Sequence, residues 1–201
     1  MRIGYIDDDF DLIETYRELF KKENIEIITP EYLLDKQGII SWIINNNLKV
    51  ILVDYKLSGK FSFNGTELIA YINSCLPNIQ CILLTAYKEE SIDEKLVINN
   101  LIVERSSYEN SDAFVQFANL IKEAEEIFDK RLNLDLLEYE ELLKKKNSQN
   151  ISSEEEVRLV NLSDLLRKYG ELDDEVPAVL KKTEIEKKVD NLLNLLGKII
   201  K

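Results

Sequence analysis

The sequence predicts an α/β fold, in which a doubly wound parallel sheet of five strands is followed by an all-helical C-terminal extension. Five short apolar runs alternate with segments whose apolar residues recur at helical spacing, which favours parallel strands joined by right-handed crossovers. Three of these runs end at a carboxylate or a hydroxyl, at Asp7, Asp54 and Thr85. No strand signal follows residue 129. We therefore expect one domain at 1–128 and a helical extension at 129–201.

The elements of the first domain follow from their apolar patterns, in chain order. The run at 49–53 is the most hydrophobic and β-branched of the early segments, which predicts a central strand. Thr29-Pro30 offers a start for the second helix. The strands are expected at 2–6, 25–28, 49–53, 79–84 and 101–103. The helices are expected at 12–20, 30–44, 65–76, 91–98 and 111–128.

The extension is predicted to hold three helices, at 132–146, 153–169 and 183–200. Ser153 is a suitable amino-terminal cap with Glu156 completing a capping box, and Gly170 is a suitable carboxyl-terminal cap. One side of the last helix is apolar, which suits packing or self-association, so a homodimer is one possibility. The apolar residues of this side are Ile185, Val189, Leu192, Leu196 and Ile199.

Composition excludes several classes of function. The 201 residues carry 26 Lys and Arg against 38 Asp and Glu, a net charge of −12, which argues against a nucleic-acid partner. The absence of histidine removes Ser-His and Cys-His nucleophile pairs and His metal sites. Cys75 and Cys81 form neither a disulfide framework nor a zinc ligand set. With no apolar leader and no membrane-spanning run, we expect a cytoplasmic protein.

Acidic side chains follow the first and third predicted strands. The carboxyl ends of parallel neighbours meet at one sheet edge, where open α/β sheets bind ligands, so Asp7-Asp8-Asp9 and Asp54 should gather there with Thr85. Two unit charges about 4 Å apart repel by roughly 4 kcal/mol at an effective dielectric near 20, which favours a bound cation. A hard divalent ion meets this need. Asp9 or Asp11 is expected to cap the following helix instead.

At these positions the sequence resembles the receiver domain of two-component response regulators, a flavodoxin-like fold. The residues that carry the resemblance are Ile6-Asp7-Asp8-Asp9, Asp54, Gly65 and Leu84-Thr85-Ala86, and it extends over about residues 1–128.

The resemblance implies a magnesium-dependent phosphoacceptor site. Asp7, Asp8 and Asp54 would hold Mg²⁺, with Lys56 lending its backbone carbonyl, and oxygen ligands of this kind are those that Mg²⁺ prefers. Asp54 would take a phosphoryl group from a phosphohistidine on a histidine kinase or phosphotransfer protein. Thr85 would be the switch hydroxyl that bonds the phosphoryl group.

The sequence departs from the family pattern after the fifth strand. The family has a lysine there, whereas this chain has Glu104-Arg105, so Arg105 is the candidate cation. Arg and Lys are not interchangeable at a tight site, because the guanidinium is larger and planar. The loop after Asp54 is longer and lacks the usual proline, and the fifth-strand aromatic residue is missing. Two possibilities stay open: Arg105 replaces the lysine, or the domain is a degenerate, unphosphorylated receiver that acts as an adaptor.

The function predicted is that of a signalling protein rather than an enzyme, with output by protein–protein interaction through the helical tail. DNA binding is not expected, because Glu154-Glu155-Glu156 and the acidic run at 171–175 oppose groove entry. A rival is a small Mg²⁺ phosphatase of the haloacid dehalogenase type, in which Asp7 of the Asp-x-Asp would be the nucleophile. A third possibility is a structural adaptor whose acids bind nothing.

Overall fold

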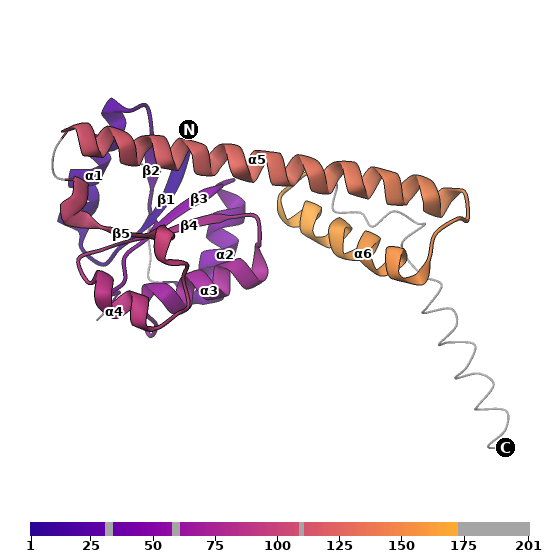
Figure 1. Ribbon diagram of the computed structural model, residues 1–201, viewed down its shortest axis with the longest axis horizontal. Helices are drawn as coiled ribbons and strands as arrows, with labels where there is room; N and C mark the ends of the chain where they lie inside the picture. The colour runs from indigo at the N-terminus through magenta and orange to yellow at the C-terminus, as the bar shows by residue number, and fades with distance from the viewer. Residues whose placement is uncertain (31–33, 58–60, 109–110, 173–201) are drawn as a thin grey trace, which may run out of the picture. The chain divides into compact units, whose positions relative to one another are not determined.

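The computed structural model describes residues 1–30, 34–57, 61–108 and 111–172 (Figure 1). Contacts divide the chain into two compact units, Met1–Arg131 and Leu132–Lys201. No helix within the described ranges is long and apolar enough to cross a membrane.

The first unit is built on one sheet of five parallel strands in the order β2-β1-β3-β4-β5. This order and direction confirm the predicted doubly wound sheet. In the register, Ile6 pairs with Val53 and Val53 pairs with Leu83, so the residues that follow β1, β3 and β4 leave the sheet at the same edge. The strands are β1 (Arg2–Ile6), β2 (Glu26–Ile28), β3 (Val50–Val53), β4 (Gln80–Thr85) and β5 (Ile102–Glu104).

Helices cover both faces of the sheet, with α1 and α5 on one side and α2 and α3 on the other (Figure 1). All four residues of β3 are buried, as expected for a central strand covered on both faces. Phe20 of α1 and Phe114 and Phe117 of α5 pack with the sheet residues in one hydrophobic core. The helices are α1 (Phe10–Lys22), α2 (Lys36–Asn45), α3 (Gly65–Cys75), α4 (Lys88–Asp93) and α5 (Ser111–Asn147), with short 3-10 turns η1 (Asn99–Leu101) and η2 (Arg105–Tyr108).

Three helices depart furthest from the prediction. Helix α2 begins at Lys36 rather than at Thr29-Pro30, because Asp35 caps it and accepts a hydrogen bond from the Gly38 N–H at 2.7 Å. Helix α4 spans Lys88–Asp93 and not 91–98. Helix α5 does not end near residue 128: it continues through the predicted domain boundary to Asn147, since no Pro or Gly interrupts its sequence.

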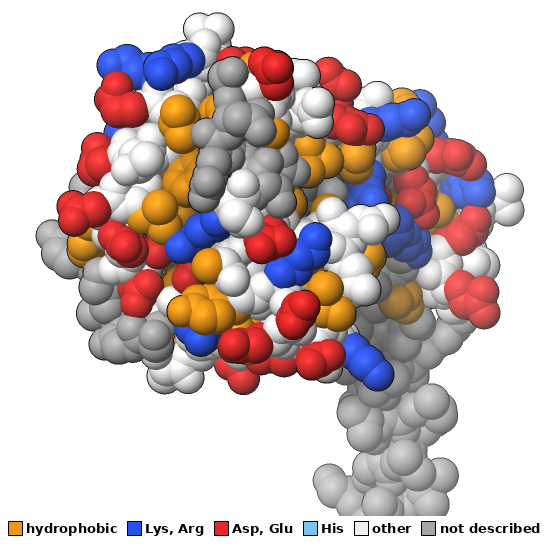
Figure 2. Space-filling model, turned by 60° about the vertical axis from the view of Figure 1, so that its left-hand side comes forward, with side chains coloured by type: hydrophobic (Ala, Val, Ile, Leu, Met, Phe, Trp, Pro, Cys, Tyr) orange, Lys and Arg blue, Asp and Glu red, His pale blue; other side chains and the backbone are white. Residues whose placement is uncertain are grey.

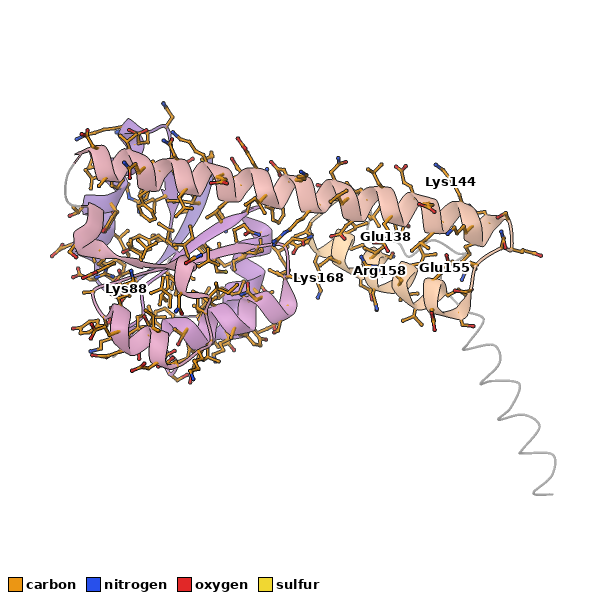
Figure 3. All side chains as sticks on the ribbon, in the orientation of Figure 1. Lys88, Glu138, Lys144, Glu155, Arg158 and Lys168 are labelled. Atoms are coloured by element: carbon orange, nitrogen blue, oxygen red, sulfur yellow. The ribbon has the colours of Figure 1, made fainter. Side chains whose placement is uncertain are left out.

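The second unit contains the end of α5 and helix α6 (Ser153–Lys168), which run antiparallel. Arg158 of α6 reaches Glu138 of α5 at 2.6 Å on the outside of this hairpin, where Figure 3 labels both. Inside it, buried Glu156 pairs with Lys146 at 2.9 Å. The hairpin core is formed by Tyr139, Leu142, Leu159, Leu162 and Leu166.

The caps of α6 correct one prediction and agree with another. Ser152, not Ser153, is the amino-terminal cap, and Glu155 completes the capping box because Glu156 is turned into the hairpin. Gly170 follows the helix with a φ of 76°, the left-handed conformation typical of a terminating glycine. The predicted helix at 183–200 lies outside the described residues.

Candidate functional site

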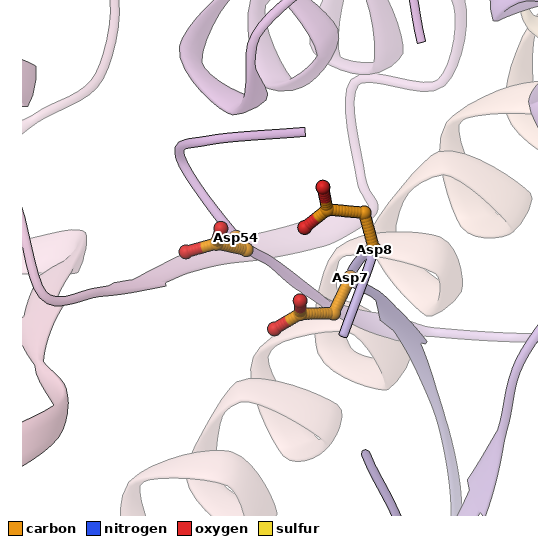
Figure 4. Close-up of side chains that lie close together, drawn as sticks. All are labelled: Asp7, Asp8 and Asp54. Atoms are coloured by element: carbon orange, nitrogen blue, oxygen red, sulfur yellow. The ribbon is translucent and has the colours of Figure 1, made fainter. Parts of the chain in front are cut away.

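Three carboxylates meet at the carboxyl edge of the sheet. Asp7 and Asp8 follow β1 and Asp54 follows β3, and their side chains point into the same space (Figure 4). One carboxylate oxygen from each lies within 4.8 Å of the others. Asp7 and Asp54 are buried, with 8% and 5% of their surface exposed, and Asp8 is half-buried. The edge thus concentrates negative charge where water is scarce, which is costly without a cation.

Asp7 is held from two sides. Its Oδ1 accepts a hydrogen bond from the Asp9 N–H at 2.9 Å, and its Oδ2 accepts one from the Tyr5 hydroxyl at 2.7 Å. Burial raises the pKa of Asp7, although the Asp9 N–H, Arg105 and Tyr5 oppose this shift. Tyr5 is fully buried, and burial together with the neighbouring Asp7 raises its pKa as well. The tyrosine therefore acts as a neutral donor that fixes the orientation of Asp7.

The two carboxylate oxygens of Asp54 differ in their hydrogen bonding to the described residues. Its Oδ2 accepts the Lys56 N–H at 3.0 Å. Its Oδ1 is buried and has no hydrogen-bond donor among the described residues. Burial raises the pKa of Asp54 to about 6; Arg105 opposes the shift and Asp7 adds to it. An oxygen in this state is available to a metal ion or to an incoming phosphorus atom.

Arg105 supplies the cation of the site. It lies at the end of β5, and a single nitrogen, Nη2, is 2.5 Å from Asp7 Oδ2 and 2.8 Å from Asp54 Oδ1. The second contact has the distance of an ion pair, but Asp54 Oδ1 is not in line for a hydrogen bond. The sequence singled out Arg105 as the replacement for a lysine. It gave no indication that one nitrogen would bridge both buried acids.

Thr85 and Lys56 lie next to this cluster with other partners. Thr85 is fully buried at the end of β4, and its Oγ1 accepts the Tyr87 N–H at 3.0 Å. The Lys56 ammonium lies 3.3 Å from the centroid of the Tyr87 ring and 3.5 Å from a carboxylate oxygen of Glu90. The Lys56 side chain therefore contacts residues at the start of α4, while its backbone N–H donates to Asp54.

Asp9 is the helix cap that the sequence predicted at Asp9 or Asp11. Its Oδ1 accepts the N–H groups of Asp11 and Leu12, each at 3.1 Å, at the start of α1. In the phosphatase alternative, Asp9 would be the second acid of the Asp-x-Asp beside the nucleophile Asp7. Its role as a cap does not favour that alternative.

A second polar cluster was not predicted. Glu94, which follows α4, accepts hydrogen bonds from the Tyr55 hydroxyl at 2.7 Å and the Asn64 amide at 2.9 Å, and it also contacts the Thr66 hydroxyl. The bond to Glu94 raises the pKa of Tyr55 to about 12. These residues tie both ends of the loop after Asp54 to α4. The partners lie 28 to 39 residues from Glu94 in the chain, and no local pattern marks them.

The residues present fit a hard divalent ion. Mg²⁺ prefers octahedral oxygen coordination with several waters retained, so the three acids and one backbone carbonyl suffice. The buried, unbonded Asp54 Oδ1 is an oxygen that such an ion would take up. Arg105 Nη2 lies 2.8 Å from that atom in this structure.

Comparison with solved structures identifies the fold. NtrX from Brucella abortus matches with a TM-score of 0.51 at 16% identity, over 66% of this chain and 29% of that one. The signal receiver domain of an HD domain-containing protein from Pseudomonas fluorescens Pf-5 matches with a TM-score of 0.51 at 13% identity, over 65% of this chain and 90% of that one. The fold is that of a response-regulator receiver domain.

This receiver fold spans less than a third of the NtrX chain. No family model matches the sequence. No curated protein matches it either. The assignment therefore rests on the sheet order and the structural likeness, and the chemistry of the site must be argued from the residues themselves.

Proposed function

We propose that the chain is a response-regulator-like signalling protein in which Asp54 accepts a phosphoryl group from a phosphohistidine of a histidine kinase or phosphotransfer protein. Mg²⁺ would be held by Asp7, Asp8 and Asp54 together with the backbone carbonyl of Lys56. The observation that carries the proposal is the convergence of three carboxylates within 4.8 Å, one of which has a buried oxygen that accepts no hydrogen bond from the described residues.

The proposed step is a phosphoryl transfer to Asp54. One carboxylate oxygen of Asp54 forms a bond to phosphorus while the bond from phosphorus to the partner's imidazole nitrogen breaks, and that nitrogen keeps the electron pair. A bound Mg²⁺ supplies charge neutralisation and alignment for an otherwise weak carboxylate nucleophile. Thr85 would donate its hydroxyl to a phosphoryl oxygen, and Arg105 would neutralise the added charge.

We further propose that the output is a protein–protein interaction through the helical second unit, with a downstream protein or a second copy of the chain as partner. Acidic and basic side chains are interspersed over the face drawn in Figure 2, and the net charge is −12. This charge does not suit a phosphate backbone. An exposed face of α5 carries Leu134 and Leu137, which suits helix packing against another protein.

One observation favours a second candidate, an adaptor that is never phosphorylated. Arg105 already pairs with both buried acids, so the site is partly neutralised without any ligand. A receiver that uses its acids only to hold β5 against β1 and β3 would have this arrangement.

Incubation with acetyl phosphate and Mg²⁺, followed by intact-mass measurement, separates the two candidates. The proposal expects a mass gain of one phosphoryl group in the wild type and in the exposed control Asp93→Asn, and none in Asp54→Asn. In a parallel experiment, beryllofluoride with Mg²⁺ should raise the melting temperature of the wild type and of Asp93→Asn, but not that of Asp54→Asn. Absence of any Asp54-dependent change in both measurements would contradict phosphorylation and favour the adaptor.

A further inference from the structure

We propose that Arg105 is a built-in competitor of the metal: its guanidinium and Mg²⁺ exclude each other from Asp7 and Asp54. The inference rests on the proposed metal site and adds how that site is regulated. Metal binding would require the Arg105 side chain to leave the two acids, so that the end of β5 reports whether the metal is bound, before any phosphoryl group arrives.

Backbone N–H groups hold two of the four carboxylate oxygens of the two buried acids. Asp7 Oδ1 is taken by the Asp9 N–H, and Asp54 Oδ2 is taken by the Lys56 N–H. The remaining oxygens, Asp7 Oδ2 and Asp54 Oδ1, are the two that contact Arg105 Nη2. The guanidinium therefore occupies the side of each carboxylate that the backbone leaves open.

A metal ion bound to the same two oxygens would need the same space. Mg²⁺ lies about 2.0–2.1 Å from its ligands. Arg105 Nη2 is at 2.5 and 2.8 Å from these oxygens, so an ion bridging them would overlap with it. Two cations at adjoining positions also repel each other. By thermodynamic linkage, the free energy by which Arg105 weakens metal binding equals the free energy by which a bound metal weakens the ion pairs of Arg105.

The attachment of Arg105 suits displacement. Its Nε is buried and makes no hydrogen bond to the described residues, and its ion pairs with Asp7 and Asp54 both pass through Nη2. The side chain is 21% exposed, which places it at the rim of the site rather than deep within it. Once displaced, the planar guanidinium can pair with phosphoryl oxygens in a two-pronged manner, which a lysine cannot do.

Calorimetric titration of the full chain with MgCl₂ at pH 8, without phosphodonor, tests the competition. We expect Arg105→Gln to bind Mg²⁺ at least tenfold more tightly than the wild type, since one competing cation is removed. Arg131→Gln, which removes an exposed cation elsewhere in the first unit, should bind like the wild type. Adding Asp54→Asn to Arg105→Gln should abolish the gain. Mg²⁺ should also raise the melting temperature more in Arg105→Gln than in the wild type.

The outcomes separate this inference from the proposed function. Mg²⁺ binding of equal or lower affinity in Arg105→Gln overturns the competition but leaves the metal site standing. No Mg²⁺ binding in either protein overturns both. Arg105→Lys provides a second variant in case Arg105→Gln does not fold, because it keeps the charge on a shorter, compact group. It should bind Mg²⁺ more tightly than the wild type, and an unchanged affinity would count against the inference.

Discussion

Gly65 and Asp54 are in direct backbone contact: a β-carbon built at position 65 would lie 2.0 Å from the carbonyl oxygen of Asp54. The Gly65 N–H also donates to the Tyr55 carbonyl at 2.9 Å. The first turn of α3 is thereby pressed against the end of β3. The position of Asp54 depends on the absence of a side chain eleven residues further along the chain.

Gly65→Ala is expected to destabilise the protein strongly, because the clash is with backbone that cannot rotate away. Overpacking of this kind costs about 1–3 kcal/mol or more. Urea unfolding followed by circular dichroism measures the change. Gly38→Ala in α2 is the matched control: its nearest contacts are side-chain atoms at 3.1 Å, so its effect should be much smaller. Equal effects at the two positions would contradict the assigned contact.

Asp54→Asn should be more stable than the wild type near neutral pH, and the difference should vanish in acid. Burial raises the folded-state pKa of Asp54 to about 6 from its ordinary value of 3.8. The folded protein therefore binds more protons than the unfolded chain between these values, and stability falls as pH rises through this window. The ionisation costs about 2–3 kcal/mol above pH 6, and this figure already includes the opposing attraction of Arg105.

Unfolding at pH 4 and at pH 7.5 measures this dependence. Asp93→Asn, at an exposed acid in α4, should show no comparable change with pH. A difference between Asp54→Asn and the wild type that is the same at both pH values would contradict the burial argument.

Glu94→Ala should loosen the loop that follows Asp54. Removing the carboxylate leaves the Tyr55 hydroxyl and the Asn64 amide without their acceptor, at a cost of about 1–3 kcal/mol. Hydrogen exchange of the peptides that contain Tyr55 and Asn64 should accelerate. Glu89→Ala removes an exposed acid from α4, the helix that precedes Glu94, and should neither destabilise the protein comparably nor accelerate this exchange. Unchanged exchange in Glu94→Ala would show that the cluster does not hold the loop.

Ser152→Ala should destabilise the second unit by about 1 kcal/mol, since it removes the capping oxygen of α6. Ser153→Ala changes the neighbouring residue, which lies inside the helix, and should be nearly neutral. Thermal unfolding of the two variants compares them directly. The reverse order of effects would restore the capping position that the sequence alone predicted.

The sheet could be predicted from the sequence because buried strands consist of consecutive apolar residues. The run at 50–53 has no polar member, and the acids that end β1 and β3 fall at one edge as soon as the strands are parallel neighbours. The meeting of the Asp7-Asp8-Asp9 run with Asp54 therefore followed from the strand ends, whereas the choice of Asp7 and Asp8 within that run came from the resemblance to receiver domains.

Helix boundaries and side-chain contacts could not be predicted as well. Neighbouring residues such as Ser152 and Ser153 have equal capping capacity, and tertiary burial of Glu156 decides between them. Continuation of α5 depended on the absence of a breaker rather than on a positive signal. The contact of Arg105 with both Asp7 and Asp54 depends on the conformation of its side chain across the sheet, and the spacing of residues in the sequence does not predict that conformation.

The ring of Tyr5 has a consequence for spectroscopy. It packs edge-on against Tyr16 at 5.8 Å between ring centroids, and Tyr16 in turn lies 6.5 Å from Phe114. Its hydroxyl meanwhile touches Asp7. Rings fixed in such chiral packing give near-ultraviolet circular dichroism, which is lost when tertiary packing loosens. A change of charge beside Asp7 should therefore alter the near-ultraviolet signal of Tyr5. Occupancy of the proposed metal site can then be followed by circular dichroism without an attached label.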